Sequence, residues 1–327
     1  MIRLLALLAL VSPILMQTAA RAQNFYAVYD PEVKAAACKT NETPSLSEIK
    51  AYLDLRAAKQ AKTSGEVASG VTLQNETAET IDALHWMLKE LPASRLPSIQ
   101  ACDSASCVTN ALWGDELGTK LSYLMVRFGL NASEYGIRSV SRFSLDQLNV
   151  LIQAVHDLPN FMLPFGRNIP FNLLHYDPRF RFQAVSNATI TFFNGWENAT
   201  PEMKQYATMH ELSHRMAYRS TSYYLDLQKD WLALGDWSRT KDVKNPWQHG
   251  AGKCFISGYS EQAPDEDFAE TASAYRYAAK RLQQTCPLKY AYMKEKVFQG
   301  VEYLNDASCE SARIRMDAFG PNEIRSR

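Results

Sequence analysis

The chain has no excess charge of either sign, no internal repeat and no low-complexity segment. Its 327 residues include 35 Lys and Arg and 35 Asp and Glu, so the formal net charge at pH 7 is zero. A neutral chain lacks the field that attracts nucleic acid or an anionic membrane surface, and we expect neither partner. With 46% hydrophobic and 21% charged residues, the composition is typical of a globular protein with one large core or two modest ones.

Long apolar runs are also scarce, and the one of note stands at the N-terminus. A basic residue precedes a leucine-rich run, and Ala20 and Ala22 supply the small residues that a signal peptidase reads. We therefore predict a signal peptide over residues 1–22. A retained membrane anchor is the alternative, but the run is short for a span and Pro13 interrupts it. The sequence thus predicts a secreted or periplasmic protein without an anchor after cleavage, and it does not indicate the oligomeric state.

The six cysteines contain no C-x-x-C pair, which argues against a cysteine zinc cluster. An even number of cysteines in an exported chain instead suggests disulfide bonds, although several connectivities are open. Proximity along the chain favours Cys102 with Cys107 and Cys254 with Cys286, which leaves Cys38 to pair with Cys309.

The first part of the mature chain, residues 23–165, has mainly helical patterns. Ser45 with Glu48, and Ser144 with Gln147, form the capping-box sequences that are typical of helix starts. We therefore predict a mainly helical N-terminal region.

Residues 166–327 combine strand patterns with helical ones. Two aromatic and β-branched segments, residues 180–185 and 188–193, predict neighbouring strands. Thr200 then offers a helix N-cap, and Pro201 stands at the favoured first helical position. We predict an α+β fold in which a long helix follows a small sheet.

The helix expected from Pro201 contains the sequence His210-Glu211-Leu212-Ser213-His214. Two histidines four residues apart lie on one helical face, about 5–6 Å apart at Cβ, so both imidazoles can reach one tetrahedral Zn²⁺. Glu211 stands beside them as a general base. A catalytic zinc has three protein ligands and one open position, so the sequence predicts a third ligand elsewhere.

The residues downstream of His214 decide between two kinds of third ligand. A metzincin would have a glycine and then a histidine where this chain has Ala217 and Ser220, so a metzincin zinc site is excluded. Farther on, Glu266 and Glu270 stand four apart in a predicted helix, where two carboxylates repel each other unless a cation is near. We expect Glu266 to bind the metal and Glu270 to accept the ring N–H of a liganding histidine.

This combination resembles the gluzincin metallopeptidases, whose third ligand is the first glutamate of an E-x-x-x-D/E helix that follows the H-E-x-x-H helix. Tyr259, seven residues before Glu266, completes an arrangement similar to that of the protease domain of anthrax lethal factor. The resemblance covers about 70 residues. It implies a zincin-like domain with a small mixed sheet and an active-site helix, and a role for Tyr259 at the zinc. The helical region has no counterpart there, and Arg215 replaces a usually uncharged residue.

Together these residues predict an exported zinc metalloendopeptidase. In such an enzyme Glu211 would take a proton from a zinc-bound water, and the zinc and Tyr259 would stabilise the oxyanion. Residues 188–193 are the expected sheet edge on which an extended peptide or protein substrate adds as a strand. Two alternatives stay open, namely a zinc amide hydrolase that acts on cell-wall peptides and a non-catalytic exported module with a structural zinc. A structural site would have a fourth protein ligand.

Overall fold

The structure is a computed structural model, and it describes residues 44–59, 61–135, 141–156, 158, 174–180, 184–186, 189–220 and 223–304. The predicted signal peptide and the predicted pair of Cys38 with Cys309 lie outside these residues.

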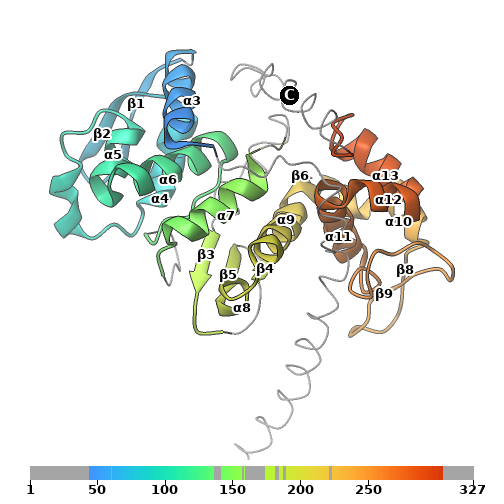
Figure 1. Cartoon of the computed structure of the whole chain (residues 1–327). Helices are drawn as coiled ribbons and strands as arrows, with labels where there is room; N and C mark the ends of the chain where they lie inside the picture. The colour runs from blue at the N-terminus through green and yellow to red at the C-terminus, as the bar shows by residue number, and fades with distance from the viewer. Residues whose placement is uncertain are drawn as a thin grey trace, which may run out of the picture.

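The N-terminal part consists of helices and one hairpin (Figure 1). Its elements are α3 (Leu46–Lys59), β1 (Thr63–Ala68), β2 (Val71–Glu76), α4 (Ala78–Met87), a 3₁₀ helix (Ala93–Ser98), α5 (Ala105–Trp113), α6 (Asp115–Phe128) and α7 (Leu145–Val155). The antiparallel hairpin of β1 and β2 was not predicted.

Both predicted capping boxes are present. The Glu48 carboxylate accepts the backbone N–H of Ser45 at 2.7 Å, and the Ser45 hydroxyl accepts that of Glu48 at 3.3 Å. The same exchange joins Ser144 and Gln147, at 2.7 and 3.2 Å. Helix α6 ends at Gly129, whose φ of 66° is in the left-handed region that favours glycine. Local sequence signals therefore set these helix ends.

The small sheet of the second part has three strands, β3 (Leu174–Asp177), β4 (Ala184–Ser186) and β5 (Ile190–Phe193). It is mixed, because β3 pairs with β5 in parallel and β4 pairs with β5 antiparallel. The prediction that residues 188–193 form a free edge is wrong, since β5 lies in the middle with a partner on each side. Of the other predicted strand, residues 180–185, Ala184 and Val185 lie in β4, Phe180 lies outside a strand, and residues 181–183 are outside the described residues. In the described part of the chain, β4 is an edge of this sheet.

Helix α9 (Pro201–Ala217) carries the H-E-x-x-H sequence and lies at the centre of the second part (Figure 1). It begins as predicted, with the Thr200 hydroxyl accepting the N–H of Met203 at 3.3 Å. Every residue from Gln205 to Ser213 is buried, so burial extends around the whole helix and is not confined to the face that carries the histidines. The reason is that α7, β4, the short helix α8 (Asn194–Glu197) and helix α11 (Pro264–Tyr277) all contact it. The histidines are therefore held in a packed interior.

Short elements and a second central helix complete the fold. They are β6 (Tyr218–Ser220), β7 (Tyr223–Tyr224), a 3₁₀ turn (Leu225–Leu227), α10 (Lys229–Gly235), β8 (Ser238–Arg239), β9 (Trp247–Gln248), α11 (Pro264–Tyr277), α12 (Ala279–Thr285), α13 (Pro287–Tyr292) and a π-helical turn (Met293–Val297). With its helices and small sheets, the described chain has the mixed α and β content that the sequence predicted.

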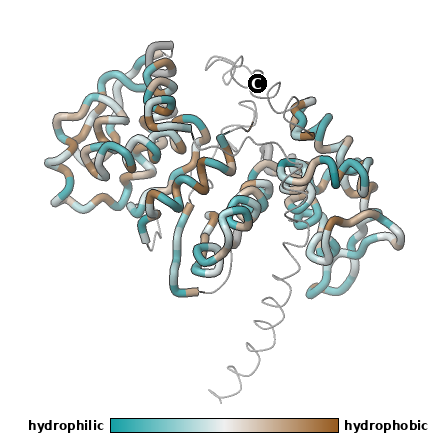
Figure 2. Tube along the Cα trace, in the orientation of Figure 1, coloured by the Kyte–Doolittle hydropathy of each residue, from teal (hydrophilic) through white to brown (hydrophobic). Residues whose placement is uncertain are grey.

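The hydrophobic core is one connected cluster that runs through both parts of the molecule. Its largest buried side chains include Phe128 and Phe143 in the N-terminal part and Trp196, Trp231 and Phe268 around α9 and α11. Figure 2 shows that apolar stretches along the chain are short and alternate with polar ones. No described helix combines the length and the hydropathy that a membrane span requires.

Two of the three expected disulfides lie in the described part and are confirmed. Cys102 is bonded to Cys107, and Cys254 is bonded to Cys286. The second closes a loop of 32 residues and ties the segment before α11 to the junction between α12 and α13. It therefore fixes a segment that leads directly into the residues described next.

Candidate metal centre

Two neighbouring helices supply the predicted site residues. α9 carries His210, Glu211 and His214, α11 carries Glu266 and Glu270, and the two helices pack side by side (Figure 1). α11 begins at Pro264, and its first turn is acidic, which complements the positive end of the helix dipole. The local sequence thus sets the acidic start of α11, and the packing of α11 against α9 places it beside the histidines.

Three donor atoms of this group converge. His210 Nε2 lies 3.1 Å from Glu266 Oε2 and 3.2 Å from His214 Nε2, and His214 Nε2 lies 3.6 Å from the same Glu266 oxygen. Ligand atoms at about 2.0–2.1 Å from a tetrahedral zinc lie about 3.3 Å from one another. The group of His210, His214 and Glu266 could therefore hold a metal ion. Two imidazoles and a carboxylate suit zinc and other divalent transition metals.

Glu270 contacts Nδ1, the ring nitrogen of His210 that points away from Glu266 and His214, as its spacing of four residues from Glu266 led us to expect. Its Oε1 accepts the Nδ1–H of His210 at 3.2 Å and the hydroxyl of Tyr206 at 3.4 Å. Its Oε2 accepts the hydroxyl of Ser257 at 2.6 Å. In the neutral ring, a proton on Nδ1 leaves the Nε2 lone pair of His210 directed at Glu266 and His214, which is the tautomer a metal ligand needs.

The charges of the cluster are balanced within it. Burial opposes a charge on His210, but the hydrogen bonds with Glu266 and Glu270 outweigh it and raise the pKa of His210 to about 10. Burial lowers the pKa of His214 to about 4. Burial acts to raise the pKa of Glu266, yet its hydrogen bond with His210 and the charges of both histidines hold it below the ordinary value. The positive charge on His210, between the carboxylates of Glu266 and Glu270, therefore stabilises their arrangement.

Glu211 lies within the same charged environment. It is 7% exposed, and burial raises the pKa of its carboxyl to about 7, while the charges of His210 and Arg215 act in the opposite direction. A carboxyl with a pKa near neutrality can both accept and release a proton there, which is what a general base that later acts as an acid requires.

Tyr259 reaches the cluster from the segment that precedes α11. Its hydroxyl donates to Glu266 Oε1 at 2.9 Å, and its ring centre lies 5.9 Å from that of His210. Burial raises the pKa of this phenol, so the hydroxyl keeps its proton and remains a hydrogen-bond donor at neutral pH. The oxygen of Glu266 that Tyr259 contacts is not the one that faces the histidines.

Sequence reasoning missed the residues that support these side chains. Asp267, next to Glu266, is fully buried and accepts from Lys289 Nζ at 2.5 Å and from Trp237 Nε1 at 3.2 Å. These contacts fasten the start of α11 to α13 and to the segment after α10. Ser257 and Tyr206 were also missed, because only the folded chain brings them to Glu270.

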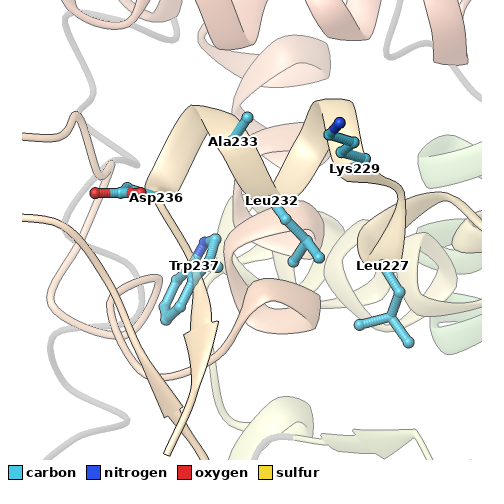
Figure 3. Close-up of a pocket in the computed structure, with 6 residues that line it drawn as sticks. All are labelled: Leu227, Lys229, Leu232, Ala233, Asp236 and Trp237. Carbon is cyan, nitrogen blue, oxygen red and sulfur yellow. The ribbon is translucent and has the colours of Figure 1, made fainter.

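A shallow cavity of about 360 Å³ lies beside α10 (Figure 3). It is lined by Leu227, Lys229, Leu232, Ala233, Asp236 and Trp237, and by none of the six residues that the sequence assigned to the site. Because it lacks a cluster of groups that could bind a metal or move a proton, we place the candidate site at the histidine and glutamate cluster.

No protein-family model, curated protein or solved structure matched this chain. Its function must therefore be inferred from the residues of the cluster and their geometry.

Proposed function

We propose that this protein is a zinc-dependent peptidase of the gluzincin type, with His210, His214 and Glu266 as the zinc ligands. The observation that carries the proposal is the convergence of three donor atoms at separations of 3.1, 3.2 and 3.6 Å. The donor set of two histidines and one glutamate is that of catalytic zinc in several peptidases. Under this proposal residues 166–327 contain a zincin-like domain.

The number of ligands favours a catalytic zinc over a structural one. Structural zinc sites have four protein ligands, whereas catalytic sites have three and leave a position for water or substrate. Among the described residues, no fourth His, Cys, Asp or Glu joins the group of His210, His214 and Glu266. Glu211, which a structural site does not need, is the next residue after His210 and is buried beside it.

The residues around the cluster have distinct tasks in peptide hydrolysis. Zinc, when bound, activates a water molecule and polarises the scissile carbonyl. Glu211 would take a proton from the attacking water as the new C–O bond forms, and would pass it to the leaving nitrogen as the C–N bond breaks. Tyr259 provides a phenolic hydrogen bond for the oxyanion. Glu270 keeps the His210 ring in the required orientation through Nδ1.

The substrate is a peptide or protein chain in this proposal, and β4 is the strand that would receive it. β4 contacts α9, and its only strand partner in the described part of the chain is β5. An extended peptide can add to such an edge through backbone hydrogen bonds. The two disulfides are consistent with an exported protein, because such bonds persist in oxidising compartments.

Metal analysis together with a peptide-cleavage assay tests the proposal. We expect the purified protein to contain one zinc per chain and to cleave casein or a mixed peptide library. A chelator should abolish cleavage, and added zinc should restore it. Replacement of His85, an exposed histidine on α4, is the matched control and should change neither result. Cleavage that survives complete removal of the metal would overturn the proposal, as would a folded protein that binds no zinc.

A further inference from the structure

A four-residue turn before α11 contacts both carboxylates of the candidate site. The hydroxyl of Ser257 donates to Glu270 Oε2 at 2.6 Å, and two residues later the hydroxyl of Tyr259 donates to Glu266 Oε1 at 2.9 Å. The turn from Ser257 to Ser260 therefore touches the expected metal ligand and also the residue that orients another ligand.

Hydrogen bonds within the turn fix the position of the Ser257 hydroxyl. Ser260 is fully buried, and its hydroxyl accepts the backbone N–H groups of Ile256 and Ser257, each at 3.1 Å, and donates to the Ser257 carbonyl at 2.7 Å. The N–H of Ser260 in turn donates to Ser257 Oγ at 3.2 Å. Because Ser257 Oγ accepts this hydrogen bond, its own proton is directed to Glu270.

A disulfide bond also anchors the chain just before this turn. Cys254, three residues before Ser257, is bonded to Cys286 at the junction between α12 and α13. The turn is thus attached on one side by the disulfide and on the other by α11, which starts at Pro264. A side chain mounted on such a turn can hold its hydrogen-bond partner in a single orientation.

The two oxygens of Glu270 have different partners. Oε1 accepts a hydrogen bond from His210 Nδ1. Within the described part of the chain, Oε2 accepts its hydrogen bond from the Ser257 hydroxyl. Glu270 is fully buried, so an oxygen that loses its donor cannot be compensated by bulk water. Without the Ser257 hydroxyl, the carboxyl group would be free to rotate toward other donors and to leave His210 Nδ1.

We propose that Ser257 is a positioning residue of the metal centre, which holds Glu270 in the orientation that keeps His210 Nε2 directed at the metal. This inference rests on the proposed metal site and adds to it a residue that touches neither the metal nor the substrate. Ser257 acts through Glu270, so its effect depends on the Glu270 carboxylate.

Zinc affinity measures this role directly, without the need for a substrate. In a competition titration of the full chain with a chromophoric chelator, we expect Ser257→Ala to weaken zinc binding about tenfold, at the low end of the effects seen for residues behind metal ligands. Ser257→Thr keeps the hydroxyl, and its zinc affinity should lie within about twofold of that of the natural chain. Valine has the shape of threonine without the hydroxyl, so Ser257→Val should lose as much zinc affinity as Ser257→Ala. Ser273→Ala is the matched control, because Ser273 is a buried serine of α11 that donates to Ala269 O.

A double variant tests whether the effect passes through Glu270. Adding Ser257→Ala to Glu270→Ala should weaken zinc binding no further than Glu270→Ala alone. If Ser257→Ala weakens zinc binding equally in the natural chain and in Glu270→Ala, the inference is wrong. It is also wrong if the natural chain binds zinc tightly and Ser257→Ala binds it with the same affinity. The latter result would leave the metal site itself intact. If the natural chain binds no zinc, both the site and the role of Ser257 are wrong. Should Ser257→Ala fail to fold, the Thr and Val variants provide the same comparison.

Discussion

The Nε2 atoms of His210 and His214 lie 3.2 Å apart, and both lie within 3.6 Å of one carboxylate oxygen of Glu266. The spacing of four residues on α9 brings the rings together, and the packing of α11 against α9 brings the carboxylate to them. Two ring lone pairs and a carboxylate at such distances repel one another unless they share a positive charge. We therefore treat the three side chains as one unit that could hold a metal ion.

Removal of one histidine should destroy this unit. We expect His214→Ala to weaken zinc binding by more than about 100-fold, because loss of a ligand should exceed the effect of losing a residue behind a ligand. The same competition titration measures it, with His85→Ala as the control. Stoichiometric zinc of unchanged affinity in His214→Ala would show that His214 is not a ligand.

Tyr259 should matter for the reaction and not for the metal. We expect Tyr259→Phe to keep its zinc and to lower kcat by about 10²-fold with little change in KM, since an oxyanion donor acts mainly in the transition state. Steady-state kinetics on one cleaved peptide, with metal analysis of the same sample, measure both quantities. An unchanged kcat would remove Tyr259 from the mechanism.

Asp226 should make stability depend on pH. Burial and the charge of Asp265 raise the pKa of Asp226 from 3.8 to about 6, and its Oδ1 has no hydrogen-bond partner in the described part of the chain. Because the folded state holds this proton more tightly, the contribution of Asp226 to stability falls as pH rises from about 4 to 6 and stays low above that range. Asp226→Asn should therefore stabilise the fold by about 1–3 kcal/mol at pH 7 and by much less near pH 3.5.

Urea unfolding at the two pH values measures this difference, and the exposed Asp82 gives the control variant Asp82→Asn. If Asp226→Asn and the natural chain unfold at the same urea concentration at both pH values, the burial of a charged Asp226 has no energetic consequence.

The helix starts and the common helical face of the two histidines in the candidate site could be predicted because their signals are local. The Ser144 and Gln147 capping box is four residues long, and Thr200 and Pro201 mark the start of α9. The spacing of His210 and His214 fixes their common helical face in the same way. Each of these features depends only on residues within one or two turns of helix.

The order of the strands and the support of the site could not be predicted from local patterns. β5 lies in the middle of its sheet because β3, which precedes it along the chain, pairs with it in parallel, and this pairing has no turn signal. The hairpin of β1 and β2 does have a local signal. Gly70, in the turn between the two strands, has a φ of 71°, and buried and exposed residues alternate at the start of β2. The hairpin was missed because the surrounding sequence has a helical pattern. Ser257 reaches Glu270 only after the chain has folded around Ser260.

Replacement of Glu211 tests the central claim most directly, because this residue acts in the chemistry and is not a ligand. Glu211→Gln and the natural chain should be compared for zinc content and for the rate of peptide cleavage in the same preparations. The account predicts one zinc per chain in both proteins and a rate that falls by about 10²–10⁴-fold in Glu211→Gln. A variant that keeps its zinc and also cleaves peptide at the full rate would contradict it.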